Sequence, residues 1–122
     1  MKVFIVDDSL ILRQRLVDML SELSEIEIIG EAGDKTEAID SIRRLKPDVV
    51  ILDIRLPKGN GIEVLQNIKK GKVPPTVIML TNYSYPQYRK KCLEAGADFF
   101  FDKSIEFERI PKVLKQLILG TE

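Results

Sequence analysis

Apolar residues occur in two alternating patterns along the chain, short unbroken runs and longer stretches with helical spacing. Five short runs, rich in Val, Ile and Phe, predict β-strands at residues 2–6, 26–31, 49–52, 76–80 and 99–101. After each run, apolar residues three or four positions apart predict an amphipathic helix. The apolar positions of the five helices are Leu12, Leu16, Met19, Leu20 and Leu23; Ala38, Ile39, Ile42 and Leu45; Ile62, Val64, Leu65 and Ile68; Tyr88, Cys92 and Ala95; and Ile110, Val113, Leu114, Leu117 and Ile118. This alternation predicts a doubly wound α/β fold, in which a single five-stranded parallel sheet has helices on both faces.

Capping and breaking residues mark the ends of several of these elements. The apolar spacing extends the first helix to about Leu23. Asp34, with Glu37 three residues later, predicts a capping box at the start of the second helix, and Pro47 ends that helix. The segment 57–61, which contains a proline and two glycines, is expected to be a loop after the third strand.

Length, charge and composition narrow the function classes. The 122 residues suffice for one domain and no repeat or linker divides them, so residues 1–122 are expected to form a single domain. The net charge is zero, which gives no bulk attraction to nucleic acid or to an anionic membrane. The absence of histidine excludes His-based acid–base catalysis, and with a single cysteine it argues against a disulfide or a zinc site. No apolar run could span a bilayer and no signal-peptide pattern is present, so a cytoplasmic protein is expected.

Polar side chains follow four of the predicted strands at the point where each strand ends. Asp7 and Asp8 follow the first strand, Asp53 the third, Thr81 the fourth, and Lys103 lies just beyond the fifth. In a parallel α/β sheet, ligands bind at the carboxyl ends of the strands, and neighbouring strands lie about 4.8 Å apart. We therefore expect these five side chains to form one site.

Three carboxylates at one sheet edge repel one another, by roughly 4 kcal/mol for each pair at about 4 Å and an effective dielectric constant near 20. Either one of them stays protonated or a cation lies among them. Because every available ligand is an oxygen, Mg²⁺ or Mn²⁺ is expected rather than zinc or copper. Such a site suits a phosphoryl group, to which Lys103 supplies a positive charge and Thr81 a hydrogen bond. Asp53, alone at the end of the most central strand, is the candidate nucleophile for an acyl phosphate.

These five residues, at these spacings, resemble the receiver domain of bacterial two-component response regulators. The resemblance covers essentially the whole chain and includes the loop from Pro57 to Gly61 and the turn at 94–97. It implies a flavodoxin-like (βα)5 fold of the chemotaxis-receiver type, with strand order 2-1-3-4-5. It also implies a signalling switch controlled by phosphorylation, with no enzymatic activity beyond its own phosphorylation and dephosphorylation.

The resemblance implies a role for each residue of the site. Asp53 takes the phosphoryl group from the phosphohistidine of a sensor histidine kinase. Asp7, Asp8 and Asp53 bind Mg²⁺, together with the backbone carbonyl of Arg55, two residues after the nucleophile. Thr81 moves toward the phosphoryl group as part of a conformational switch.

The resemblance also places the output surface on the fourth helix, the fifth strand and the fifth helix. Phe100, three residues before Lys103, is the second switch residue and turns inward behind Thr81. Positive charge at 89–91 lies beside a group of acids on this surface. The acids are Asp98, Asp102, Glu106 and Glu108. Charges of both signs on one patch suit a two-fold contact, so a homodimer through this surface is predicted.

Two loops contain residues that set this chain apart. Ser104 follows Lys103 where the family usually has a proline, often after a cis peptide bond. A cis bond before serine would cost about 3 kcal/mol, so a trans bond is expected. Arg55 and Tyr83 each lie two residues beyond a residue of the site. Both are large enough to flank the approach of the hydrolytic water, so dephosphorylation is predicted to be slower than in a variant with small residues at both positions.

Other functions remain open on the same fold. A Mg²⁺-dependent phosphatase with an aspartyl-phosphate intermediate usually has a second acid where this chain has Arg55. A nucleotide or flavin carrier would need a glycine-rich or Ser/Thr-rich loop after the first strand, where this chain has Asp7 and Asp8. A receiver-like scaffold that is never phosphorylated would not need all five site residues. The chain is either a receiver alone or the first domain of a longer regulator with a C-terminal DNA-binding domain, and the receiver itself is not expected to bind nucleic acid.

Overall fold

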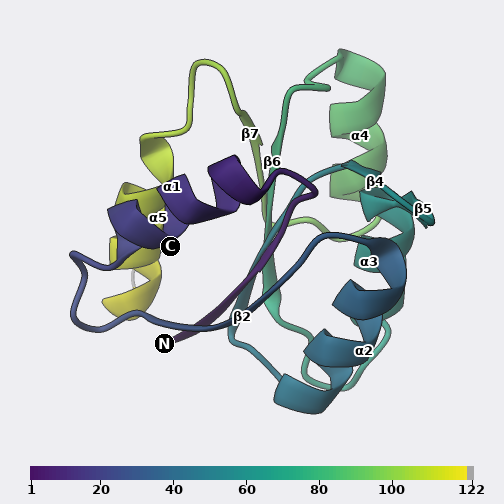
Figure 1. The fold of residues 1–122 in the computed structure, drawn as a ribbon. Coiled ribbons are helices and arrows are strands. Elements are labelled where there is room, and N and C mark those ends of the chain that lie inside the picture. The colour runs from purple at the N-terminus through teal and green to yellow at the C-terminus, as the bar shows by residue number, and fades with distance from the viewer. Residues whose placement is uncertain (121–122) are drawn as a thin grey trace.

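The computed structural model describes residues 1–120 and contains a main sheet of five parallel strands in the order β2-β1-β3-β6-β7 (Figure 1). The strands are β1 (Lys2–Val6), β2 (Glu27–Ala32), β3 (Val49–Leu52), β6 (Thr76–Thr81) and β7 (Phe99–Asp102), with a separate pair β4 (Arg55–Leu56) and β5 (Gly59–Asn60). The helices are α1 (Leu10–Leu20), α2 (Lys35–Leu45), α3 (Gly61–Ile68), α4 (Pro86–Glu94) and α5 (Arg109–Ile118). Because β6 and β7 are the fourth and fifth strands of the main sheet, the predicted order is confirmed. None of the helices in the described part of the chain has the length and hydrophobicity that crossing a bilayer requires.

Helices cover both faces of the sheet. α1 and α5 lie on one face, and α2, α3 and α4 lie on the other (Figure 1). Each face has its own apolar cluster, and β3 contributes Val50 and Leu52 to one and Val49 and Ile51 to the other. All four of these side chains are at most 1% exposed. Burial of each contributes roughly 1.5–3 kcal/mol, so β3 is firmly held at the point where Asp53 leaves the sheet.

The first helix is shorter than predicted. α1 ends at Leu20 rather than near Leu23, because the Ser21 hydroxyl donates to the Asp18 carbonyl at 2.8 Å and the chain then turns. Leu23 still packs against the sheet as a partly buried residue. Its apolar character therefore reflects packing rather than helical structure, which spacing alone cannot distinguish.

Side-chain caps begin two helices on the same face of the sheet. Asp34 accepts a hydrogen bond from the Glu37 amide at 2.8 Å and so caps α2, which is one half of the predicted capping box. The reciprocal capping box occurs at α3, where Asn60 accepts from the Glu63 amide and the Glu63 carboxylate accepts from the Asn60 amide, both at 2.9 Å. These caps fix the start of both helices near the end of β3.

The segment between β3 and α3 is a hairpin rather than the predicted loop. β4 pairs with β5 in antiparallel fashion. Lys58, between the two strands, and Gly59, the first residue of β5, have φ angles of 67° and 152°. Strands of two residues show no periodic pattern, so the sequence could not reveal this pairing. The hairpin returns the chain so that Gly61, the first residue of α3, lies against the backbone of Asp53.

Proline and glycine lie at the ends of helices in the second half of the chain. Pro86 opens α4, and Pro111 lies in the first turn of α5, where a missing amide hydrogen costs little. Gly96 follows α4 with a φ of 104°. All peptide bonds within residues 1–120 are trans, so the expected trans bond between Lys103 and Ser104 is confirmed.

Candidate functional site

The carboxyl ends of four strands bring the candidate residues to one edge of the sheet. β1 is followed by Asp7, β3 by Asp53 and β7 by Lys103, while Thr81 is the last residue of β6. The Asp53 amide donates to the Val6 carbonyl at 3.0 Å, so the two aspartates leave neighbouring strands side by side. Asp7 is 2% exposed and Asp53 is 6% exposed. Two acids are therefore buried at the same place, which requires a compensating positive charge.

Lys103 supplies part of that charge. Its Nζ lies 2.6 Å from Asp7 Oδ2 and 2.8 Å from Asp53 Oδ2, and its side chain is 13% exposed. The other carboxylate oxygens accept backbone hydrogen bonds, Asp7 Oδ1 from Ser9 at 2.8 Å and Asp53 Oδ1 from Ile54 at 2.7 Å. Loss of one partner from a buried ion pair typically costs about 3–5 kcal/mol. The ammonium group of Lys103 and the carboxylates of Asp7 and Asp53 consequently stabilise one another in their charged forms.

The ionisation of the buried groups reflects both burial and pairing. Burial raises the pKa of the Asp7 carboxyl, although hydrogen bonds from Lys103 and from the Ser9 amide oppose that shift. Burial also disfavours the charge on Lys103. Its hydrogen bonds to Asp53 and to Asp7 outweigh burial, however, so the pKa of the ammonium group is raised. Lys103 therefore stays charged at neutral pH.

Asp7, Asp8 and Asp53 form a cluster that could hold a metal ion. One oxygen from each of them lies within 4.8 Å of the others, and Asp8 is exposed whereas the other two are buried. An oxygen-only donor set fits Mg²⁺ or Mn²⁺, and the exposed side leaves room for water or phosphate oxygens. The residues present therefore fit the expected ion. The Arg55 carbonyl as a further ligand stays a prediction.

Thr81 is fully buried beside these charged residues. Its Oγ1 accepts a hydrogen bond from the Tyr83 amide at 3.1 Å, and its carbonyl accepts one from the Lys103 amide at 2.9 Å. The backbone thus connects the threonine directly to the lysine. The hydroxyl is engaged with its own loop, and its role toward a phosphoryl group stays a prediction.

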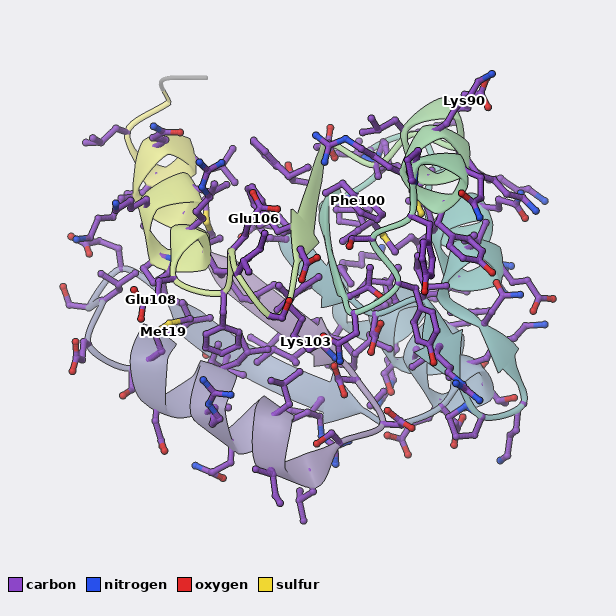
Figure 2. All side chains as sticks on the ribbon, turned by 90° about the horizontal axis from the view of Figure 1, so that it is seen from above. Met19, Lys90, Phe100, Lys103, Glu106 and Glu108 are labelled. Carbon is purple, nitrogen blue, oxygen red and sulfur yellow. The ribbon has the colours of Figure 1, made fainter. Side chains whose placement is uncertain are left out.

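Phe100 faces the side of the sheet that α4 covers (Figure 2). It is 4% exposed, and the Arg89 guanidinium lies 5.6 Å from the centre of its ring. Phe99 and Phe101 lie on the opposite face, with ring centres 6.1 Å apart. The three phenylalanines therefore divide between the two faces of the sheet, and the structure shows Phe100 in an inward position. Its function as a switch stays a prediction.

Arg55 and Tyr83, the two predicted rate-setting residues, contact each other. The Arg55 guanidinium donates a hydrogen bond to the Tyr83 hydroxyl and lies 5.5 Å from the centre of its ring. Tyr83 in turn meets Tyr88 of α4 edge to face, with ring centres 6.4 Å apart. The pair joins the segment after β3 to the loop after β6, next to Asp53 and Thr81 in the chain.

Sequence reasoning missed the role of Asp102, the last residue of β7. Its carboxylate accepts hydrogen bonds from the Ser84 hydroxyl at 2.5 Å, the Ser104 hydroxyl at 2.5 Å and the Ser104 amide at 2.8 Å. The hydrogen bonds from Ser104, then from Ser84, lower the pKa of Asp102. An Asp with a Ser two residues later is a known local turn pattern, but the contact with Ser84 is tertiary and has no sequence signal.

A large cavity lies far from these acids, at the amino ends of β3 and β6. Its volume is about 740 Å³, and Asp48 and Thr76 are among its lining residues. Basic residues line it as well, including Arg43 and Lys46 near the end of α2 and Lys70 just after α3. Cations at the ends of helices complement the partial negative charge of the last carbonyl groups. Arg43, in the last turn of α2, fits this pattern.

Comparison with known proteins gives one family and many relatives. A family model described as "Response regulator receiver domain" matches residues 3–115. The chain is 38% identical over 116 residues to the sensory transduction protein LytT of Bacillus anthracis, which covers 95% of this chain and 46% of that protein. It is 34% identical to the DNA-binding transcriptional activator DevR/DosR of Mycobacterium tuberculosis, with 98% of this chain and 55% of that protein covered. The chain thus spans about half the length of these curated relatives.

The fold matches solved structures of similar chains. One is the complex of CheX and CheY with BeF3⁻ and Mg²⁺ from Borrelia burgdorferi, in which the matched chain is 32% identical with a TM-score of 0.80. The alignment covers 93% of this chain and 88% of that one. The similarity therefore extends over the whole sheet and its helices.

Proposed function

The chain belongs to the response regulator receiver domain family, and on this basis we propose that it is a signalling switch in which Asp53 accepts a phosphoryl group from a sensor histidine kinase. The observation that carries the proposal is the position of Lys103, whose ammonium group joins Asp53 and Asp7 at the carboxyl edge of the sheet. Residues 1–122 would act as one phosphoacceptor domain.

The chemistry needs no general base, because a carboxylate is already a nucleophile. One oxygen of Asp53 forms a bond to phosphorus while the P–N bond of the donor phosphohistidine breaks, and the electron pair of that bond stays on the imidazole. Lys103 now shares its hydrogen bonds between Asp7 and Asp53 and would transfer one of them to a phosphoryl oxygen. The Thr81 hydroxyl would donate a hydrogen bond to another phosphoryl oxygen.

A divalent cation completes the proposed site. Mg²⁺ or Mn²⁺, held by Asp7, Asp8, Asp53 and the Arg55 carbonyl, would neutralise charge on the phosphoryl oxygens. Lys103 alone offers one positive charge to three carboxylates. Phosphorylation should therefore stop when the metal is chelated.

The direct test uses a small phosphodonor and intact-mass measurement. The chain with acetyl phosphate and Mg²⁺ should gain the mass of one phosphoryl group, and the same mixture with excess EDTA should not. A chain that binds Mg²⁺ and gains no mass would favour the receiver-like scaffold. Steady release of phosphate from phosphate esters would favour a phosphatase, although Arg55 occupies the position of its usual second acid.

Asp8→Ala is expected to weaken Mg²⁺ binding by at least about tenfold, or ~1.4 kcal/mol, because it removes a charged ligand. Stability without metal should stay equal or rise, since one repulsive charge is lost. The exposed Asp8 is not the cap of α1, because Ser9 fills that role by accepting from the Leu12 amide. Calorimetric titration measures the binding and urea denaturation in EDTA measures the stability. A clear loss of stability in EDTA would show that Asp8 has a structural role.

The Arg55→Ala/Tyr83→Ala double variant is expected to lose its phosphoryl group several-fold faster than the wild type. The contact between the two side chains spans adjacent loops of the site and would hinder the hydrolytic water. Phosphate decay after removal of the donor measures the rate. Tyr85→Ala is the control, because Tyr85 is 57% exposed in the same loop and contacts Tyr88 rather than Arg55. An unchanged or slower rate in the double variant refutes the prediction.

The proposed output surface comprises α4, β7 and α5, and the structure reduces its predicted charge complementarity. Lys90 lies at the outer side of α4, while Glu106 and Glu108 lie on the other side of β7 (Figure 2). Three of the four predicted acids are engaged within the chain, however. Asp98 pairs with Lys69 at 2.8 Å, Glu106 pairs with Arg109 at 3.3 Å, and Asp102 binds two serines. The predicted homodimer stays a prediction, and we expect such a contact to rely more on packing than on these charges.

A homodimer through this surface is therefore proposed to be weak until Asp53 is phosphorylated. Phe100→Ala is expected to abolish association on phosphorylation while leaving phosphorylation itself intact, because Phe100 is held by packing under α4. Sedimentation of both proteins, with and without a phosphoryl mimic and at two salt concentrations, measures this. If the phosphorylated wild type keeps its monomer mass at high concentration, the surface serves another protein instead.

The effector of the whole protein is a further part of the proposal. A relative of twice the length is named as a DNA-binding transcriptional activator. A DNA-binding domain beyond the receiver would convert phosphorylation into a change of transcription. The net charge of the receiver itself is zero, which gives no bulk electrostatic attraction to DNA.

A further inference from the structure

Asp102 contacts the loop that follows Thr81 and the loop that contains Lys103, and its side-chain hydrogen bonds within the described residues go to these loops rather than to Asp53 or the metal-binding acids. In the parallel register it is the partner of Thr81, and it directly precedes Lys103. Its side chain points to the loops rather than to the acidic cluster, because its hydrogen-bond partners are Ser84 and Ser104. It can act on the site only through its neighbours.

The two oxygens of Asp102 serve different loops. Oδ1 accepts from the amide and the hydroxyl of Ser104, which closes a turn within the loop that follows β7. Oδ2 accepts from the hydroxyl of Ser84, in the loop that follows β6. The Asp102 amide donates a hydrogen bond to the Glu106 carboxylate at 3.0 Å, which further restrains the position of Asp102. One ionised carboxylate thus ties the loop of Lys103 to the loop of Thr81.

Ser104 makes this arrangement possible. A proline at this position would have neither the amide hydrogen nor the hydroxyl that Asp102 accepts. The amide of Ser104, which any residue except proline retains, holds one oxygen of the carboxylate so that the second oxygen faces Ser84. The hydrogen bonds also favour the ionised form and lower the pKa of Asp102. The contact with Ser84 is consequently a charge-assisted hydrogen bond, the stronger kind.

We propose that Asp102 is a positioning residue that holds the Thr81 loop in its unphosphorylated position through the hydrogen bond to Ser84. Ser84 is three residues from Thr81, and the Tyr83 amide between them is bonded to the Thr81 hydroxyl. If the Thr81 side chain turns toward a phosphoryl group on Asp53, it loses the hydrogen bond from the Tyr83 amide, and Tyr83 directly precedes the Ser84 that Asp102 holds. The inference rests on the proposed function, because it concerns how readily phosphorylation moves this loop.

Thermodynamic linkage predicts how this hydrogen bond changes the affinity of the chain for a phosphoryl mimic. A hydrogen bond present in only one of two states lowers the apparent affinity of any ligand that needs the other state. Ser84→Ala removes this bond and should tighten the binding of the phosphoryl mimic BeF3⁻, with Mg²⁺, by roughly fivefold, the factor that about 1 kcal/mol provides. Ser104→Ala removes a hydroxyl bond of the same 2.5 Å length to the same carboxylate. It leaves the link to Ser84 in place and should change the affinity little.

The experiment is an NMR titration of the chain with BeF3⁻ in the presence of Mg²⁺, together with urea denaturation of each variant. Wild type, Ser84→Ala, Ser84→Thr and Ser104→Ala are compared. Ser84→Thr retains a hydroxyl and should restore the wild-type affinity. The two alanine variants should lose similar stability, so a merely structural role of Asp102 would affect both affinities alike.

Each outcome decides the matter. Tighter binding in Ser84→Ala alone, reversed in Ser84→Thr, supports the inference. Equal affinity in wild type and Ser84→Ala, or the same change in Ser104→Ala, overturns it while leaving phosphorylation of Asp53 intact. A wild type that does not bind the mimic overturns the proposed function and this inference with it.

Discussion

Gly61→Ala is expected to destabilise the chain by roughly 3 kcal/mol or more, within the range of the most damaging single substitutions. A Cβ at this position would lie 1.8 Å from the carbonyl oxygen of Asp53 and 2.9 Å from Cα of Ile54. These are backbone atoms, so no side chain can turn aside to relieve the overlap. The Gly61 amide also donates to the Ile54 carbonyl at 2.5 Å, which shows how closely the two segments approach.

The same overlap should damage the site as well as the fold. Relief requires the backbone of Asp53 to move, and its carboxylate would move away from Lys103. Gly71→Ala is the matched control, because no atom lies within 4 Å of its added Cβ. Urea denaturation of both variants gives the free energies of unfolding. Similar stability of Gly61→Ala and Gly71→Ala would show that the close packing of α3 against Asp53 is not required.

The main sheet could be predicted because its signals are local and strong. The run from Val49 to Leu52 is apolar on both faces, which is typical of an inner parallel strand, and the structure buries all of it. The site followed from the same reasoning. Once β1, β3, β6 and β7 are parallel neighbours, Asp7, Asp53 and Lys103 must lie at one edge of the sheet.

What could not be predicted depends on contacts between distant segments. The spacing of apolar residues predicted that the first helix reaches Leu23. Spacing reflects which residues are buried, and Leu23 is partly buried, but it does not reveal that the helix ends before Ser21. The β4–β5 hairpin is too short to leave a pattern. Arg55 and Tyr83 could be placed near the site by counting from neighbouring residues, but their mutual hydrogen bond could not.

The partners of the acids were equally hidden from sequence reasoning. Lys103 was expected to meet a phosphoryl group, whereas the structure shows that it already pairs with Asp7 and Asp53. Asp102 was counted with the acids of an output surface, whereas its carboxylate accepts from Ser84 and Ser104. In each case the residue type is evident in the sequence, whereas its partner depends on the tertiary structure.

Asp53→Asn is expected to abolish phosphorylation entirely while the chain stays folded. The amide lacks the second anionic oxygen that attacks phosphorus, so no acyl phosphate can form. Its carbonyl oxygen can still accept from the Ile54 amide, and Lys103 keeps its contact with Asp7. The loss of labelling therefore cannot be attributed to unfolding, which circular dichroism and urea denaturation would verify. Labelling of Asp53→Asn at the wild-type level would show that Asp53 is not the acceptor.

The measurement that tests the central claim most directly locates the phosphoryl group on the wild-type chain. After acetyl phosphate and Mg²⁺, borohydride reduces an aspartyl phosphate to homoserine, and peptide mass spectrometry identifies the converted residue. The assignment of Asp53 as the acceptor, with Lys103 and the other acids beside it, predicts homoserine at position 53 and unchanged aspartate at positions 7 and 8. Conversion at Asp7 or Asp8, or a phosphorylated chain with Asp53 unchanged, would contradict the account.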